Sequence, residues 1–551
     1  MWTPRAQGIT RDPLPSRLAV LVGIVAFAVY LLTLSPGVSW EHHSEDSGDL
    51  IASAWVLGIP HPTGYPLFTM LGWVWSHVLP FGLVAWRMNV FSALWGALAA
   101  AIMVRAVWAS FGLLPHGIFL TLTRKGRAVA SCSAGLILAF ATDVWSLSIV
   151  TEVYSLNLFF TALISWILVE LLVLANAAEH ADAASAAETA RRRGRLISLL
   201  AVSWGLALTN HLTGLFLLPS IVLVLGLGGL NPRPGELARG ILWLILPLLL
   251  YFYLPIRSLM NPPLDWGNPE NLDNFVWVVT GSQFRKLMFA LLPYEMLHQI
   301  TRYNSIPVEL GAPGALAAGL GLCKLFMSRG RGIVLLLVHS LLLVASSLFY
   351  LASYYIWDPE GYLMPMIWAA SFWAGWALVL LVHLPVKWVP AGRAAGIVLL
   401  VVAPIVALVG HWKEVDLSGD YDAMRFGEES FEAFEPDALV LEIRYERAFT
   451  LWYYRDVEYA DSRDDVAVVF IEHALFDWGL DLLRRKYPDV VLPAVPLTGA
   501  EKDARTAAWI IENNIDTRPI YSGATVDELV EKGYRFEAVG LMYRVFPPGA
   551  T

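Results

Sequence analysis

The sequence predicts an α-helical protein that crosses a membrane many times and ends in a small α/β domain. Of its 551 residues, 57% are hydrophobic and 15% are charged, a balance outside the range of soluble domains. Apolar runs of roughly 17 to 25 residues recur between residues 18 and 410, and each is long enough to cross the hydrocarbon core of a bilayer. Beyond residue 411, short β-branched runs alternate with amphipathic stretches, which is typical of an α/β domain with a largely parallel sheet.

The charge balance and the cysteines narrow the functional classes. The net charge of −9 leaves no basic patch suited to nucleic acid, so no nucleic-acid partner is expected. Cys132 and Cys323 lie in or beside apolar runs, and we expect packed core residues rather than a disulfide. The basic N-terminus lacks a small-residue cleavage site after its first apolar run, which predicts a retained signal-anchor helix.

Eleven spanning helices account for the apolar runs, and one further helix is expected to enter the membrane without crossing it. This re-entrant or juxtamembrane helix covers residues 64–80, because the distribution of Lys and Arg is consistent only if this segment does not cross. The expected domains are a transmembrane domain at 1–410 and a soluble domain at 411–551. The spanning helices are predicted near residues 18–36, 86–110, 128–147, 154–175, 196–209, 212–228, 241–256, 311–327, 333–351, 362–383 and 394–410.

Lysine and arginine occur mainly in the connections on one side of this arrangement. By the positive-inside rule that side is cytoplasmic, which places the N-terminus inside and residues 411–551 outside. The opposite side collects most of the polar motifs. The basic residues of the cytoplasmic side are Arg5, Arg11, Arg17, Arg124, Lys125, Arg127, Arg191, Arg192, Arg193, Arg195, Arg233, Arg239, Arg329, Arg331, Lys387 and Arg393.

Four carboxylates follow the first predicted span: Glu41, Glu45, Asp46 and Asp49. Acids at a membrane surface are costly, so a cluster of them indicates a functional site. If a helix begins at Ser47 or Gly48, Asp49 lies in its first turn and Asp46 just precedes it, where free backbone N–H groups keep a carboxylate ionised. An ionised carboxylate can act as a general base. A simple N-cap explains the same spacing equally well.

A segment rich in proline and glycine, GIPHPTGYP, follows these acids and cannot form a helix. It is expected to form a rigid turn into the re-entrant helix and to hold His61 and Tyr65 at the site. The pair His42–His43 lacks the spacing of metal ligands, so we expect it, with Glu41, to face solvent or headgroups. The acids alone do not establish a divalent ion, and neither a metal nor another cofactor is assigned.

Seven further polar side chains fall on the same predicted outer face. Glu152 lies at a helix start, where it also compensates the helix dipole, and Asn210 and His211 interrupt an apolar run. Arg257 is suited to bidentate phosphate binding, although snorkelling to lipid headgroups explains it as well. The seven residues are Glu152, Asn210, His211, Arg257, Arg285, Asp358 and Glu360.

A carboxylate base beside donors for a phosphate suits transfer from a phosphate leaving group to a hydroxyl acceptor. A lipid-anchored phosphate donor would explain why such a site lies at the bilayer surface. The non-enzymatic alternative is a transporter or flippase of a lipid-linked glycan, which should show an internal repeat and ionisable groups near the middle of the membrane. We find no repeat, and the ionisable residues lie at outer helix ends, which favours an enzyme.

Several ordered motifs resemble one family over roughly residues 18 to 370. They are EDSGDLIASAWVLGIPHPTGYPLF, AWRMNVFSALWGAL, TEVYSLN, LTNHLT, YLPIRSLMNPPLDWGNP, VTGSQF and DPEGYLMP. The chain resembles the bacterial polytopic membrane proteins related to a vertebrate endoplasmic-reticulum protein O-mannosyltransferase, within the C-type (GT-C) glycosyltransferase superfamily.

The resemblance implies a GT-C-like fold, a polyprenyl-phosphate-linked sugar donor, inversion at the anomeric carbon and an acidic base in the first outer loop. Carried onto this sequence, the base is Asp46, with Glu45 or Asp49 as a second acid; the family often has Glu where this chain has Asp49. The donor-phosphate candidates are His211, Arg257 and Arg285, and the other substrate-binding candidates are His61, Tyr65, Glu152, Asn210, Asp358 and Glu360.

We therefore expect a membrane glycosyltransferase that moves a sugar, with mannose as one candidate, from a polyprenyl-phosphate donor to a hydroxyl acceptor. The expected acceptor is Ser or Thr of an exported protein, and glycan or lipid acceptors are alternatives. The resemblance implies a multi-pass protein of the bacterial inner membrane, in contact with the lipid bilayer and with its C-terminal domain in the periplasm.

Overall fold

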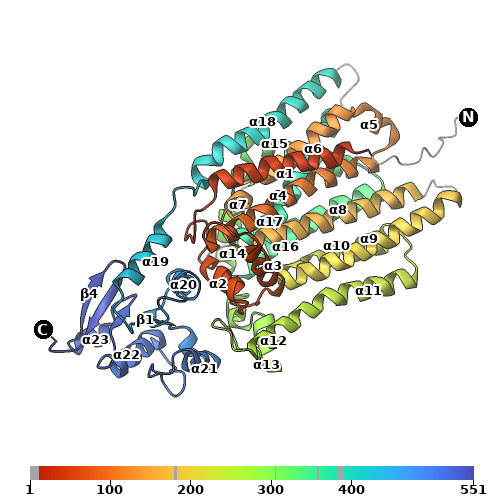
Figure 1. Cartoon of the computed structure of the whole chain (residues 1–551). Helices are drawn as coiled ribbons and strands as arrows, with labels where there is room; N and C mark the ends of the chain where they lie inside the picture. Colours follow the sequence, from red (N-terminus) through yellow and green to blue (C-terminus); the bar gives the residue numbers. More distant parts are fainter. Residues whose placement is uncertain (1–11, 179–182, 304–305, 356–358, 383–388, 551) are drawn as a thin grey trace, which may run out of the picture.

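The computed structural model describes residues 12–178, 183–303, 306–355, 359–382 and 389–550. Long helices lie side by side in a bundle, and a small α/β region continues from one end of it (Figure 1). The connection is α18 (Val389–Val415), which leads from the bundle to α19 (Asp422–Ala433). We refer to residues 416–550 as the C-terminal region.

Within the described residues, eight helical stretches are long and apolar enough to cross a membrane. Each overlaps a predicted span, so the chain is a multi-pass membrane protein. The eight are α1 (Leu14–Thr33), α4 (Val84–Ser110) with η1 (Phe111–Leu113), α8 (Tyr154–Ala178), α11 (Pro234–Leu248) with η3 (Leu249–Phe252) and α12 (Tyr253–Ser258), α15 (Ile306–Met327), α16 (Arg331–Ser353), α17 (Glu360–Leu381) and α18.

The other three predicted spans correspond to helices that are shorter or more polar. They are α6 (Arg124–Ala139), α9 (Ala183–Asn210), and η2 (Leu212–Leu217) with α10 (Leu218–Leu227). Several short helices connect the long ones: α2 (Ser47–Val56), α3 (Pro66–Val78), α5 (His116–Thr121), α7 (Thr142–Ser146), α13 (Leu272–Val279), η4 (Ser282–Leu287) and α14 (Pro293–Tyr303). With 13 residues, α3 is about 20 Å long, which is too short to cross a hydrocarbon core of about 30 Å.

The single helix predicted at 128–147 is wrong, because the chain breaks after Ala139. The carbonyl of Ala139 accepts a hydrogen bond from the Tyr30 hydroxyl at 2.8 Å. The N–H of Asp143, four residues later, donates instead to Glu309 Oε2 at 3.1 Å. In a continuous helix the Asp143 N–H would donate to the Ala139 carbonyl. Because Tyr30 and Glu309 bind these two groups instead, α6 and α7 form as separate helices.

The centre of the bundle is α17, whose residues are mostly buried between neighbouring helices. It packs closely against α15 at Gly321, where a Cβ atom would lie only 1.6 Å from the carbonyl oxygen of Trp373. Small residues allow membrane helices to approach in this way. In contrast, α1, α11 and α18 expose many apolar side chains, as expected for helices that face lipid.

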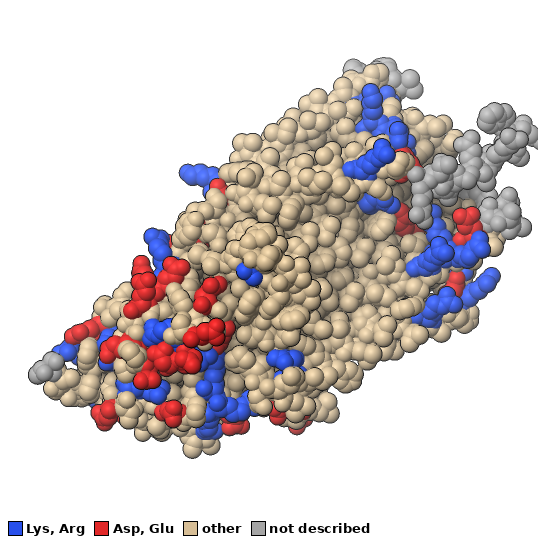
Figure 2. Space-filling model, in the orientation of Figure 1, with Lys and Arg blue, Asp and Glu red and all other residues tan. Residues whose placement is uncertain are grey.

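Charged residues separate along the bundle. Figure 2 shows Lys and Arg at the end remote from the C-terminal region, with a wide uncharged band between the two ends. Contacts among the basic connections agree with this grouping: Arg393 donates to the Thr121 carbonyl at 2.9 Å, and Arg193 pairs with Glu236 at 2.8 Å. The connections predicted to share one side of the membrane therefore lie at one end of the bundle.

The C-terminal region contains a five-stranded sheet in the order β2-β1-β3-β5-β4. β1 (Leu439–Glu442) runs parallel to β2 (Ala467–Phe470) and β3 (Ile520–Ser522). β5 (Met542–Phe546) is antiparallel to β3 and to β4 (Arg535–Val539). The sheet is thus mixed rather than largely parallel, because the last two strands form a hairpin whose tight turn has Gly540 at φ 59°.

Helices cover this sheet, and several of them contact the bundle, α20 most closely. They are α19, α20 (Tyr445–Tyr453), η6 (Tyr454–Glu458), η7 (His473–Leu475), α21 (Asp477–Lys486), α22 (Lys502–Asn514) and α23 (Asp527–Glu531). α20 packs against α2 so closely that a Cβ atom on Gly48 would lie 2.4 Å from the backbone of Phe449. Nearby, the Trp40 indole donates to the Glu446 carbonyl at 3.0 Å. The loop after α1 and the C-terminal region therefore form one packed unit.

Replacing Gly48 with alanine should loosen this unit. The added methyl group would have to push α2 away from the α20 backbone, and overpacking of this kind costs about 1–3 kcal/mol. We expect a lower Tm for the detergent-solubilised Gly48→Ala protein, measured by differential scanning fluorimetry. Gly410→Ala is the matched control, because a Cβ atom on Gly410 of α18 would meet no other part of the described chain within 4 Å; its Tm should be equal or higher. Equal Tm values for Gly48→Ala and the wild type would contradict the tight contact.

Candidate active site

The acidic cluster lies at the start of α2. The helix begins at Ser47, with Asp46 at the N-cap position and Asp49 in the first turn, as the spacing predicts. The Asp46 side chain makes no capping hydrogen bond. The N-cap explanation therefore does not account for this carboxylate, which leaves it available for other contacts.

The proline- and glycine-rich turn returns the chain over the first turn of α2. Leu57 ends α2 in a left-handed conformation (φ 51°), and Tyr65 precedes α3 in another (φ 36°). Ile59 pairs with the loop after α12, donating to the Leu264 carbonyl at 2.8 Å and accepting from the Trp266 N–H at 3.1 Å. These bonds hold the turn in place and bring His61 next to the acids.

Asp49 is fully buried and anchors His61. Its Oδ2 accepts from the His61 backbone N–H at 2.8 Å and from ring Nδ1 at 2.9 Å, while Oδ1 accepts from the Ser53 hydroxyl at 3.1 Å. A carboxylate at this distance requires the ring proton on Nδ1. The bond therefore fixes the orientation of the imidazole between the two aspartates.

The second nitrogen of the imidazole faces Asp46. His61 Nε2 lies 3.3 Å from Asp46 Oδ2, and the Asp46 side chain is 38% exposed whereas that of Asp49 is 1% exposed. Burial raises the pKa of Asp46. The charge of Asp49 also raises this pKa, whereas the attraction of His61 lowers it. The two aspartates thus differ in what they can do: Asp46 can meet a substrate, and Asp49 positions His61.

Tyr65 joins this group to His211. The Tyr65 hydroxyl lies 3.1 Å from His61 Nε2, and its ring stacks on the His211 ring with centroids 5.9 Å apart and an interplanar angle of 12°. Tyr154 and Tyr362 complete an aromatic wall around His211, with centroids 5.6 and 5.8 Å from it. The structure therefore brings four predicted site residues, Asp46, His61, Tyr65 and His211, into one continuous cluster.

His211 enters this cluster as an uncharged ring. Its Nδ1 accepts from the Thr213 N–H at 3.2 Å, so Nε2 carries the ring proton. Burial lowers the pKa of His211 to about 4, and nearby His61 acts in the same direction. At neutral pH His211 can donate a hydrogen bond from Nε2 but brings no positive charge.

Glu152 and Asn210 line the same part of the bundle behind the aromatic wall. Glu152 is 3% exposed, and its backbone N–H donates to the Ser92 hydroxyl at 3.3 Å. Asn210 donates to the Val153 carbonyl at 3.3 Å, and its buried Oδ1 has no hydrogen-bond partner in the described part of the chain. The negative charge of Glu152 acts on Tyr65, which places the glutamate close to the cluster.

The two predicted phosphate-binding arginines make hydrogen bonds outside the acidic cluster. Arg257 contacts the other end of α2, where Nε donates to the Leu57 carbonyl at 2.7 Å and Nη2 to the Val56 carbonyl at 3.2 Å, a favourable position for a cation. Arg285 is exposed and donates to the Thr280 hydroxyl at 2.7 Å. Their phosphate-binding roles stay predictions.

The remaining predicted residues lie around the cluster. Glu45 directly precedes Asp46, and burial raises the pKa of its carboxyl. Glu360 begins α17, and its Oε1 lies 3.2 Å from His43 Nε2. His43, which the sequence suggested to face solvent or headgroups, therefore contacts a candidate site residue. Asp358 lies outside the described residues.

Trp266 is a site residue to which the sequence assigned no role. Its ring is 1% exposed and lies between His61, at 6.2 Å, and His473 of the C-terminal region, at 4.5 Å. The motif LDWGNP follows Arg257 closely, and a tryptophan amid glycine and proline was the available signal. Trp266 connects the acidic cluster to the C-terminal region.

The arrangement can take a proton from a substrate hydroxyl at Asp46, with His61 holding the carboxylate in place. Among the described residues, no three His, Cys, Asp or Glu side chains form a group that could hold a metal ion. A partly exposed carboxylate beside an aromatic wall is an arrangement suited to general-base chemistry.

Comparisons with known proteins agree with the motifs. Residues 46–228 match the family model described as Protein O-mannosyl-transferase TMEM260 N-terminal domain. Protein O-mannosyl-transferase TMEM260 of Mus musculus is 34% identical over 271 residues, which is 48% of this chain and 34% of the relative. The Dictyostelium discoideum relative of the same description is 28% identical over 268 residues, 47% of this chain and 29% of the relative. The chain thus spans about a third of the length of the curated relatives it matches.

A solved structure shows the same fold along nearly the whole chain. ArnT from Cupriavidus metallidurans, in a crystal structure bound to undecaprenyl phosphate, superposes with a TM-score of 0.54 at 15% identity, covering 97% of this chain and 98% of ArnT. This likeness shows that the two chains share one fold along nearly their whole lengths, the C-terminal region included. The resemblance that the ordered motifs indicate is confirmed by the family model and the curated relatives.

Removing the Asp49 carboxylate should destabilise the protein. In Asp49→Ala, the His61 N–H groups would lose their acceptor in a buried place, at a cost of about 2–4 kcal/mol. Ser53→Ala is the matched control, since it removes one bond to the same carboxylate at about 1 kcal/mol. We expect a clearly lower Tm for Asp49→Ala than for Ser53→Ala in detergent. Similar Tm values for the two variants would show that Asp49 does not anchor the turn.

Proposed function

We propose that the chain is a membrane glycosyltransferase. It is related through residues 46–228 to the TMEM260 protein O-mannosyl-transferases, and it has a GT-C-like fold. It would transfer a sugar from a polyprenyl-phosphate donor to a hydroxyl acceptor, with mannose and Ser or Thr of an exported protein as the first candidates. The observation that carries the proposal is the Asp46–His61–Asp49 group, which holds one partly exposed carboxylate in a fixed position.

In this mechanism Asp46 acts as the general base. It takes the proton of the acceptor hydroxyl as the acceptor oxygen attacks the anomeric carbon from the face opposite the phosphate. The bond from the anomeric carbon to the phosphate oxygen breaks, and the polyprenyl phosphate leaves with the bonding electrons. One displacement of this kind inverts the anomeric configuration. His61 keeps the carboxylate aimed at the acceptor and is itself fixed by Asp49.

The leaving phosphate needs hydrogen-bond donors close to Asp46. His211 Nε2 is a suitable neutral donor, because it belongs to the same cluster through Tyr65. Arg257 lies at the far end of α2, which is about 15 Å long, so it could meet the same phosphate only after releasing Leu57 and Val56. We therefore assign the first phosphate contact to His211 and keep Arg257 and Arg285 as candidates for the outer part of the donor.

The site is proposed to face the extracytoplasmic side of the membrane. The basic connections lie at the end of the bundle remote from the C-terminal region (Figure 2), whereas α2, where the acidic cluster lies, is close to that region (Figure 1). By the positive-inside rule the basic end is cytoplasmic. The C-terminal region would then lie outside, in the periplasm if the protein belongs to a bacterial inner membrane. A lipid-linked donor could present its headgroup there without leaving the bilayer.

Loss of the Asp46 carboxylate should abolish transfer without unfolding the protein. Purified protein in nanodiscs would be given synthetic polyprenyl-phosphate mannose and Ser/Thr-containing peptides, and transfer would be followed by mass spectrometry. We expect Asp46→Asn to be at least about 100-fold slower. Its Tm should be no lower, since the raised pKa of Asp46 means that ionisation costs stability at neutral pH.

Glu41→Gln is the matched control for this experiment. Glu41 lies in the same loop and is exposed, so its transfer rate should stay close to that of the wild type. Full activity in Asp46→Asn would rule out the assigned base. If the wild type consumed no polyprenyl-phosphate sugar with any acceptor, the transferase proposal itself would fail.

The pH profile of transfer should report the environment of Asp46. A base works only when ionised, so kcat/KM should fall as the pH drops through the pKa of Asp46. An ordinary aspartate has a pKa of about 3.9. Because burial raises the pKa of Asp46, the fall in kcat/KM should occur at a higher pH than that. The measurement is kcat/KM in a constant-ionic-strength buffer series from about pH 4 to 8. An unchanged rate down to the lowest pH at which the protein stays folded would contradict the proposed environment.

A further inference from the structure

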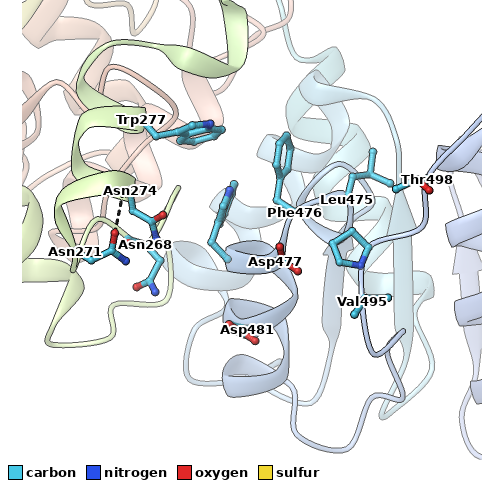
Figure 3. A pocket seen from close by; sticks show the side chains of 12 residues that line it. Asn268, Asn271, Asn274, Trp277, Leu475, Phe476, Asp477, Asp481, Val495 and Thr498 are labelled. Carbon is cyan, nitrogen blue, oxygen red and sulfur yellow. Dashed lines mark hydrogen bonds between the residues drawn. The ribbon is translucent and has the colours of Figure 1, made fainter.

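A second cavity lies between the bundle and the C-terminal region. It has a volume of about 710 Å³, within the range of about 300–1,000 Å³ typical of ligand pockets. One wall comes from α13 and the loop before it, and the other from α21 with residues 495–498. Figure 3 shows Asn268, Asn271 and Asn274 on the first wall facing Phe476 and Asp477 on the second.

Aromatic rings form part of both walls. The Trp277 ring of α13 lies 5.7 Å from Phe476 and 5.9 Å from Trp478, and Phe476 stacks on Trp478 at an angle of 20°. Trp478 is 9% exposed, and its buried indole nitrogen has no hydrogen-bond partner in the described part of the chain. Trp277, Phe476 and Trp478 thus form one aromatic group beside the cavity.

The polar side chains of the cavity are amides and carboxylates. Asn271 and Asn274 each use part of their hydrogen-bonding capacity to shape the start of α13: the Asn274 N–H donates to Asn271 Oδ1 at 2.9 Å, and Asn274 Nδ2 donates to the Asn268 carbonyl at 2.8 Å. Each amide keeps a further donor or acceptor. Asp477 lies opposite, and no Lys or Arg occurs among the described residues that line the cavity.

We propose that this cavity binds a neutral saccharide. Sugar hydroxyls both donate and accept, which matches amide and carboxylate side chains, and the C–H faces of a pyranose ring suit the negative faces of Trp277 and Phe476. A phosphate group would require cations. A peptide would typically add to a sheet edge or fill an apolar groove, and the described residues of the lining include no strand.

The ring of Trp266 separates the saccharide site from the acidic cluster. Trp266 is 6.2 Å from His61 on one side and 6.1 Å from Trp478 on the other. A sugar bound here would therefore be too far from Asp46 to be the transferred residue. It would be a unit that the acceptor already carries, which makes glycosylated acceptors the ligand class for this cavity. The binding itself does not depend on the transferase proposal.

Saturation-transfer-difference NMR on the full chain in nanodiscs tests the proposal directly. The probes are methyl α-mannoside, mannobiose and other neutral disaccharides, with a Ser/Thr-containing peptide and inorganic phosphate as comparison ligands. We expect millimolar or tighter binding of at least one saccharide. Trp277→Ala and Asp477→Asn should each weaken it by about fivefold or more, with far-UV circular dichroism and Tm unchanged.

Two variants of α13 serve as controls. Asp273→Asn and Val276→Ala change exposed residues of the same helix that do not line the cavity, so saccharide binding should stay at the wild-type level. The proposal is overturned if no saccharide binds the wild type, or if Trp277→Ala and Asp477→Asn bind like the controls. Binding of the peptide alone, lost in Trp277→Ala, would also overturn it and assign the cavity to peptide. Because Asp46→Asn should bind saccharide normally, failure of this proposal can be told apart from failure of the transferase proposal.

Discussion

The buried carboxylate of Asp49 is the constraint on which the acidic site depends. An ionised group without water needs hydrogen-bond donors, and Asp49 obtains them from the His61 backbone, the His61 ring and Ser53. Satisfying these bonds fixes two features together: the path of the turn before α3 and the orientation of the His61 ring. The buried carboxylate therefore sets the ring that faces the partly exposed one, and this ring cannot rotate without breaking a buried bond.

The C-terminal region takes part in the same construction. Gly48 lets the α20 backbone approach the first turn of α2, and Asp265, beside Trp266, accepts from Arg485 at 3.3 Å. Burial raises the pKa of Asp265 to about 6, so this link between the bundle and α21 is strongest where the carboxylate is ionised. Trp266 thus lies between the acidic cluster and Trp478 of the aromatic cavity.

The sequence located the site much better than it assigned its members. Four acids after an apolar run, a rigid turn and polar motifs predicted to face outward were enough to predict a helix start at Ser47 or Gly48. They also placed Asp46, His61, Tyr65 and His211, which the structure brings together, among the candidates. The separation of Arg257 from these residues could not be predicted, because the topology gives only the membrane face on which a residue lies. Likewise, residues distant in sequence broke the predicted helix at 128–147 through Tyr30 and Glu309, which no local periodicity reveals.

The sequence by itself determined that the chain is a multi-pass membrane protein, because hydrophobicity and run length are sums over neighbouring residues. It also determined the family resemblance, because motif order is a property of the linear chain. Only the tertiary structure decided that Asp49 is buried while Asp46 is partly exposed, and that Trp266 lies between the site and the C-terminal region. Burial and contact depend on residues far apart in the chain, so two aspartates three positions apart can differ fully in what surrounds them.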